Sequence, residues 1–404
     1  MKRPHYAWVI CAVCTLLMFC TVGLTNTAFS VYQPYLVAAN GMNNTQGSFI
    51  VTIRNLLGLI AALLVDRFYR RTGFRFGTAL SAMAAALAFF LFSGFRGLVP
   101  AYVSAAMLGV TYGLGGMVPV SILIGRWFRG SRSYAMGICA AGSGMASVVV
   151  PPVATLLIES LGLNAALCIE AGACLLIAGV AWLSLRDDPA ALDLKPFGAD
   201  SDMKKRPEDS EAAGMTRGVR IAVCASVALM GALANPAFSH LSMLFREEGH
   251  SAALISALLS LMGFSLAAGK IIYGRMADRL GAYRSGWIFF SFLVLGELLC
   301  ALSGQGSRIV ALAAMVVLGM GLPLCSVGLS VFARHLAGKE EYAGTIKRFQ
   351  VLYQAGGLAF GPIPGIFADR LGSYVPFYAL MVLFALTSAA LMQFGILFSK
   401  SRKA

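Results

Sequence analysis

Two basic side chains lie inside stretches that are otherwise apolar: Arg54 in FIVTIRNLLGL and Lys270 in SLAAGKIIYGR. A positive charge in such surroundings is suited to binding an anion, above all a carboxylate. Arg54 also has a structural interpretation, as a link between helices. We favour anion binding because acids deep inside the predicted helices are scarce: they are Glu170 and Glu297. For Lys270 the spacing leaves two interpretations open, anion binding and a side chain that reaches up to the membrane surface.

The composition shows which elements must position these cations. The chain has 404 residues, of which 58% are hydrophobic and 12% charged, and its mean hydropathy is +0.76. Long apolar runs with few charges predict membrane helices, and continuous runs without alternation exclude barrel strands. The runs cover residues 8–36, 47–65, 77–93, 101–124, 134–158, 164–185, 220–244, 252–273, 286–303, 309–332, 346–367 and 375–397. We therefore predict an all-α membrane protein with twelve transmembrane helices.

The basic residues are distributed unequally between the two sides of the membrane, and the net charge is +14. With a cytoplasmic N-terminus, all Lys and Arg residues fall on the cytoplasmic side except six. Those six are Arg96, Arg246, Arg308 and Arg370 on the opposite side, and Arg54 and Lys270 within helices. This positive-inside pattern predicts a multi-pass protein of the plasma (inner) membrane with both termini in the cytoplasm. The charge therefore indicates topology and contact with anionic lipids, not nucleic-acid binding.

The chain divides in its middle. Residues 186–217 are polar and read as a flexible cytoplasmic linker between two six-helix bundles, residues 1–185 and 218–404. The halves also resemble each other: DRFYRRTGFR from Asp66 follows the second predicted helix, and DRLGAYR from Asp278 follows the eighth. We therefore expect two pseudo-symmetric bundles.

Prolines indicate a finer, three-helix period. They interrupt the predicted helices 8–36, 101–124, 134–158, 220–244, 309–332 and 346–367, and are absent beyond the first turn from 77–93, 164–185, 286–303 and 375–397. Because lipid cannot replace the hydrogen bonds that proline removes, the interrupted helices should face protein or a water-filled cavity. Every third helix, namely 77–93, 164–185, 286–303 and 375–397, should therefore form the outer scaffold.

These features resemble the major facilitator superfamily. GRMADRLGAYR, from Gly274 to Arg284, is close to the superfamily's G-x-x-x-D-R-x-G-x-x-R loop, and the copy at Asp66 lacks the glycines. FSVYQPYL, GVTYGLGG and RWFRGSRSYAMGICAAGSG look like the monocarboxylate porters and the oxalate/formate-type antiporters. The acids of these loops can pair with arginines of neighbouring loops and so form a cytoplasmic gate; the alternative is that the loop charges only set the topology. We assign to the gate Asp66, Arg67, Arg126, Gly274, Asp278, Arg279 and Arg284.

The resemblance also bears on Lys270, which lies eight residues before Asp278. In these porters a basic residue near that position binds the substrate carboxylate, although the family usually has arginine. Other positions differ as well: the porters' aspartate one turn earlier is Leu266 here, and the second cation of the oxalate-type porter is replaced by FQVLYQAGG. These differences argue against oxalate as the substrate. Lysine, unlike arginine, can lose its proton, so Lys270 is also a candidate proton carrier.

Polar residues on the proline-containing helices complete the expected cavity. Each alone would more often mark hydrogen bonding between helices. With Lys270, Arg54 and the adjacent Asn55, the predicted substrate-binding residues are Asn26, Gln33, Tyr112, Asn235, His240, Gln350, Tyr353 and Gln354.

No catalytic, metal or cofactor motif is visible in the sequence. The CxxC pair of Cys11 and Cys14 has no second pair to complete a zinc site, and the glycines from Gly137 to Gly144 are not a nucleotide loop. We therefore expect not an enzyme but a monomeric secondary transporter of a small organic anion, most simply a monocarboxylate, that works by alternating access and is coupled to protons. The alternatives are an exporter of drugs or hydrophobic compounds, against which no acid lies on a cavity helix, and a non-transporting membrane sensor.

Overall fold

In the computed structural model, the described residues are 5–27, 29–42, 44–129, 131–198, 216–303, 306–337, 341–361 and 363–400. The chain forms two compact units, Met1–Ser201 and Asp202–Ala404. Within the described residues the regular structure is helical, apart from one isolated bridge between Phe128 and Phe197. The prediction of an all-α fold is confirmed.

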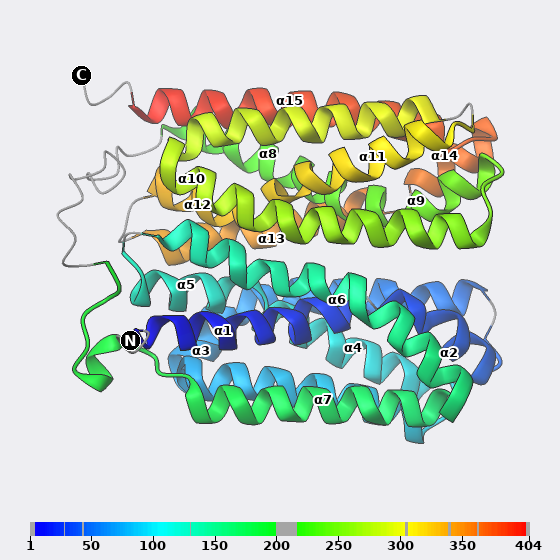
Figure 1. The fold of residues 1–404 in the computed structure, drawn as a ribbon, viewed down its shortest axis with the longest axis horizontal. Helices are drawn as coiled ribbons and strands as arrows, with labels where there is room; N and C mark the ends of the chain where they lie inside the picture. The colour runs from blue at the N-terminus through cyan, green and yellow to red at the C-terminus, as the bar shows by residue number, and fades with distance from the viewer. Residues whose placement is uncertain are drawn as a thin grey trace. The chain divides into compact units, whose positions relative to one another are not determined.

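The first unit contains the helices drawn from blue to green in Figure 1. They are α1 (Ala7–Met18), the π-helix η1 (Phe19–Thr27), the 3-10 helix η2 (Phe29–Val31), α2 (Gln33–Ala39), α3 (Asn44–Gly94), α4 (Leu98–Gly115), α5 (Met117–Trp127), α6 (Arg132–Leu161), α7 (Leu163–Ser184) and the 3-10 helix η3 (Pro189–Leu192).

The second unit contains the helices drawn from green to red. They are α8 (Arg217–Ala234), α9 (Pro236–Glu247), α10 (Ala252–Leu302), α11 (Arg308–Gly321), the 3-10 helix η6 (Leu322–Cys325), α12 (Val327–Ala337), α13 (Tyr342–Phe360), α14 (Ile363–Leu371) and α15 (Val375–Lys400).

Two helices, one in each unit, are long enough to cross a membrane twice. The described residues contain 10 helical segments that are long and apolar enough to span, and α3 and α10 supply the two longest. Each of these helices has 51 residues and is broken at a glycine with positive φ, Gly73 or Gly281. Because each break divides its helix into two spans, the ten segments correspond to the twelve predicted helices.

The same two glycines define how the halves of the chain correspond. Each is the thirtieth residue of its helix, so the breaks are equivalent positions. Asp278 lies three residues before its glycine, whereas Asp66 lies seven residues before Gly73. The sequence repeat that paired Asp66 with Asp278 is therefore displaced by one helical turn, and Arg70 occupies the position equivalent to Asp278.

Most of the predicted proline interruptions are breaks in the helices. The helix changes direction or type beside Pro34, Pro119, Pro236 and Pro323, where α2, α5, α9 and η6 begin. Proline at the first positions of a helix leaves unmade only a hydrogen bond that would be missing there anyway. α6 is the exception, because it continues through Pro151 and Pro152.

The proline-free spans expose large apolar side chains, as a lipid-facing scaffold requires. Examples are Met83, Leu87 and Phe90 of α3, Leu175 and Leu176 of α7, Leu295 and Leu298 of α10, and Leu383 and Phe394 of α15.

The beginning of the predicted linker packs on the first unit rather than extending freely. The amide of Phe197 donates to the carbonyl of Trp127 at 2.8 Å, and its ring packs against Trp8 and Phe128. The rest of the predicted linker, residues 199–215, lies outside the described part of the chain.

Candidate substrate site

Arg54 lies in the first half of α3 and its side chain points into the first unit. The residue is only 8% exposed. Its Nη1 donates to the carbonyl oxygen of Thr25 in η1 at 3.2 Å, and its guanidinium lies over the ring of Phe29, 5.5 Å from the centroid. Among the described residues, no carboxylate forms an ion pair with it. The guanidinium can form five hydrogen bonds, so this arrangement leaves donors for a ligand.

Glycines on α4 hold the helix around Arg54 in place. A Cβ on Gly109 would overlap the carbonyl oxygen of Arg54, and one on Gly113 would overlap that of Gly58. The two helices therefore touch backbone to backbone, which side chains at these positions would prevent. The glycines of GVTYGLGG thus fix the depth and rotation of the span that carries Arg54.

The other residues predicted for the site in the first unit lie in different surroundings. Tyr112 on α4 is half-buried and close enough to Arg54 to interact with it electrostatically. Asn26 in η1 is half-buried, and the side chain of Gln33 is outside the described part. Asn55 is exposed although Arg54 is buried, because neighbouring side chains of a helix point about 100° apart. The fold therefore does not bring Asn55 beside Arg54.

Glu170, a buried acid of the first unit, has a hydrogen-bond partner of its own. The hydroxyl of Tyr32 donates to Oε1 of Glu170 on α7 at 2.8 Å, and both residues are buried. Glu170 therefore stabilises the packing of the first span on α7 and does not neutralise Arg54.

Lys270 lies in the first half of α10, within the second unit. It is 5% exposed, which argues against the side chain that reaches up to the membrane surface. The adjacent Gly269 packs closely on α11 and η6, where a Cβ would lie 3.0 Å from the Cγ of Pro323. Leu266, one turn earlier, is buried as well. The close contact of Gly269 with α11 and η6 thus places Lys270 in the interior of its unit.

The residues predicted on the spans α8–α9 and α13 also lie in the second unit. Gln350, Tyr353 and Gln354 are buried, and Nε2 of Gln354 has no hydrogen-bond partner among the described residues. Asn235, at the break between α8 and α9, packs against Gly357 of α13.

His240 lies on α9, further along the same span. Its Nδ1 is 2.9 Å from the carbonyl oxygen of Pro236, and its ring is 6.0 Å from that of Tyr374. The histidine therefore lies about one turn after the start of α9 and near the loop that precedes α15.

The predicted gate residues differ in burial. Asp278 and Gly274 are buried and Asp66 is half-buried, whereas the gate arginines are exposed: Arg67, Arg126, Arg279 and Arg284. Arg126 lies over the ring of Phe74 at 5.0 Å, and its Nη1 donates to the carbonyl oxygen of Asp187 at 3.2 Å.

Asp187 is a residue that the sequence analysis missed. Its carboxylate accepts hydrogen bonds from the amides of Phe74 and Arg75 at 2.9 and 2.8 Å, at the start of the helix after Gly73. The RDDP motif that follows the sixth predicted helix was the available signal, but its partner is far away in sequence.

The family model of the major facilitator superfamily matches residues 14–362. The chain belongs to the major facilitator superfamily. It is thus a multi-pass membrane transporter rather than an enzyme, and the fold described above is that of the superfamily.

Relatives within the superfamily are named after different transported compounds. Monocarboxylate transporter 12 of Rattus norvegicus is 23% identical over 430 residues, which cover 96% of this chain and 85% of the relative. The human protein of the same name is also 23% identical. The agnestins efflux protein AgnL12 of Paecilomyces divaricatus is 27% identical over 278 residues, or 66% of this chain and 60% of the relative.

Solved structures of the superfamily share the fold. The proton:xylose symporter XylE bound to 6-bromo-6-deoxy-D-glucose superposes with a TM-score of 0.76 at 14% identity, and the match covers 97% of this chain and 96% of that one. This likeness concerns the fold alone.

Proposed function

We propose that this superfamily member is a secondary active transporter of a small organic anion, of the monocarboxylate class, and that it works by alternating access with coupling to protons. The observation that carries the proposal is the buried guanidinium of Arg54, which no described carboxylate neutralises. A charge buried in a membrane protein is costly and marks a functional site by default. A bound carboxylate would supply the missing negative charge.

Three further observations support an anionic substrate. A second buried cation, Lys270, lies in the other unit, so each unit has a buried basic side chain of its own. Gln350 and Gln354 add buried polar groups to the second unit. Relatives that align over nearly the whole chain are named monocarboxylate transporters. In this proposal the protein is a monomer in the plasma (inner) membrane, both termini are cytoplasmic, and the exposed gate arginines lie at the cytoplasmic face.

Ligand-induced stabilisation of the purified protein tests the proposal. A ligand that binds the folded state at 100 times its Kd adds about 2.7 kcal/mol to the free energy of unfolding. We expect a monocarboxylate such as lactate or pyruvate to raise the unfolding temperature and to be taken up by proteoliposomes. Arg54→Ala and Lys270→Ala should abolish both effects, while Arg246→Ala, which removes an exposed arginine on α9, should preserve them.

Two outcomes would contradict the proposal. One is full carboxylate binding and uptake by both the Arg54 and the Lys270 variant. The other is stabilisation by hydrophobic compounds and not by carboxylates, which would favour an exporter like the fungal efflux relatives.

A further inference from the structure

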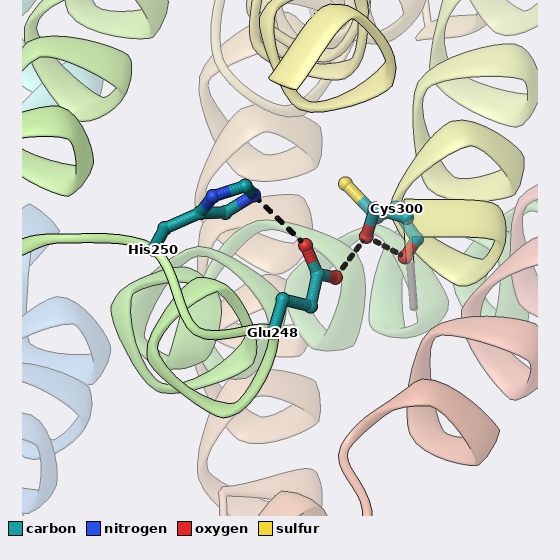
Figure 2. A network of polar contacts seen from close by, with 4 residues as sticks. Glu248, His250 and Cys300 are labelled. Carbon is teal, nitrogen blue, oxygen red and sulfur yellow. Dashed lines mark hydrogen bonds and ion pairs between the residues drawn. The ribbon is translucent and has the colours of Figure 1, made fainter. Parts of the chain in front are cut away.

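A polar network joins the end of α9 to the end of α10 in the second unit (Figure 2). Glu248 follows α9, His250 lies in the loop after it, and Ser303 follows α10. The Ser303 hydroxyl is hydrogen-bonded to Oε1 of Glu248 and lies 2.6 Å from the carbonyl oxygen of Cys300. The other carboxylate oxygen of Glu248 lies 3.4 Å from Nε2 of His250.

Glu248 and His250 are well placed to share a proton. Their side chains are only 2% and 5% exposed, and neither Oε2 of Glu248 nor Nε2 of His250 has a hydrogen-bond partner among the described residues. Burial raises the pKa of Glu248, while Ser303 and His250 act in the opposite direction. The other titratable groups that interact with Glu248 are Glu247, Cys300 and Tyr378.

Glu297 lies further along the same face of α10. It precedes Cys300 by three residues and Ser303 by six, so the three side chains form a line over nearly two helical turns, about 9 Å in length. Glu297 is 0% exposed. Neither of its carboxylate oxygens has a hydrogen-bond partner among the described residues.

The groups around Glu297 do not give it a structural role, because none of those described is hydrogen-bonded to its carboxylate. Cys300 of α10, Cys325 of η6 and Tyr378 of α15 interact with it electrostatically, but none of them donates a hydrogen bond to it. The Tyr378 hydroxyl donates instead to the carbonyl of Ala237 at 2.8 Å. Glu170, by contrast, has its Tyr32 partner.

An unpaired carboxylate in such a site carries a desolvation cost of several kcal/mol, which a bound proton removes. We propose that Glu297 is a proton-binding site of this transporter, and that protons reach it through the Glu248–His250 pair. The proton passes from water to that pair and then to a carboxylate oxygen of Glu297, with no other bond made or broken. That this proton drives anion transport rests on the proposed function. That Glu297 binds a proton does not depend on it.

Infrared spectroscopy of the purified protein tests proton binding without any substrate. A protonated carboxylic acid has a C=O stretch separate from that of a carboxylate. We expect one such band to disappear in Glu297→Gln and to lose intensity as the pH rises. Glu170→Gln identifies the band of a second buried acid. The proposal fails if Glu297→Gln leaves the spectrum unchanged, or if the Glu297 band is independent of pH.

Deuterium exchange of the same band tests the route. Glu248→Gln and His250→Gln should slow the exchange severalfold. Glu247→Gln is the matched control, because its carboxylate accepts from the Tyr374 amide at 2.9 Å and should leave the rate unchanged. Equal rates in all of these variants would overturn the route. If Glu297→Gln does not fold, Glu297→Asp keeps the acid and should shift the band instead of removing it.

Transport measurements separate this inference from the proposed function. If both hold, Glu297→Gln exchanges anion for anion but loses accumulation driven by a pH gradient. If carboxylates do not bind at all, the proposed function fails while the infrared result still decides the proton site.

Discussion

Asp187 caps the helix that begins at Phe74, across 113 residues of sequence: its carboxylate accepts a hydrogen bond from the Phe74 amide at 2.9 Å. A second bond, from the Arg75 amide, completes the cap. A carboxylate at this place satisfies amides that have no partner within the helix and interacts favourably with the positive end of the helix dipole. The segment after α7 is thereby joined to the break between the second and third spans.

Removal of this cap should destabilise the protein. We expect Asp187→Ala to lower the free energy of unfolding by about 1 kcal/mol, the usual cost of a lost helix cap. Asp187→Asn should cost less, because it keeps an acceptor and loses the charge. Thermal unfolding in detergent measures the effect. Asp188→Ala is the control, because exposed Asp188 caps only the short η3; an equal loss in both variants would contradict the assignment.

The contact between α3 and α4 should not tolerate a methyl group. Gly109→Ala would drive a Cβ into the backbone of Arg54, and overpacking of this kind costs about 1–3 kcal/mol. We expect a lower unfolding temperature and weaker carboxylate binding, because Arg54 is displaced. Gly179→Ala in α7, where a Cβ meets nothing within 4 Å, should be neutral or stabilising. Unchanged binding by Gly109→Ala would show that Arg54 is not held by this contact.

Lys270→Arg distinguishes two proton carriers. The sequence offered Lys270 itself, whereas the structure points to Glu297. Arginine keeps the positive charge but effectively cannot lose its proton. With Glu297 as the carrier, Lys270→Arg should still accumulate anion under a pH gradient, and uptake into proteoliposomes measures this. If the variant exchanges anions but loses that accumulation, Lys270 carries the proton.

Stability should depend on pH through Glu248. Because burial raises its pKa above the ordinary 4.5, the folded protein holds this proton to higher pH than the unfolded chain does. The unfolded chain then binds fewer protons, so stability falls as the pH rises from about 4.5 through the raised pKa. Glu248→Gln cannot titrate and should gain on the parent over that range. Unfolding temperatures from pH 4 to 8 check this, with Glu247→Gln expected to follow the parent; parallel curves for the parent and Glu248→Gln would contradict it.

The sequence by itself determined the helical membrane class, the family and the breaks at Pro119, Pro236 and Pro323. These properties follow from local composition: apolar length, and the hydrogen bond that proline cannot make. It also identified Arg54 and Lys270, because a charge within an apolar run is visible without knowledge of the fold.

The tertiary structure alone decided which of the predicted residues lie together. Asn55 is adjacent to Arg54 in sequence but exposed, because neighbouring residues of a helix point in different directions. Asp66 is one turn away from the position equivalent to Asp278, because the breaks at Gly73 and Gly281 define which positions of the two halves correspond. Asp187 and the Glu248–His250–Ser303 network join segments that are distant in sequence, and no local pattern encodes such pairs. Whether a buried acid has a partner, as Glu170 has and Glu297 has not, depends on the neighbouring helices that pack against it.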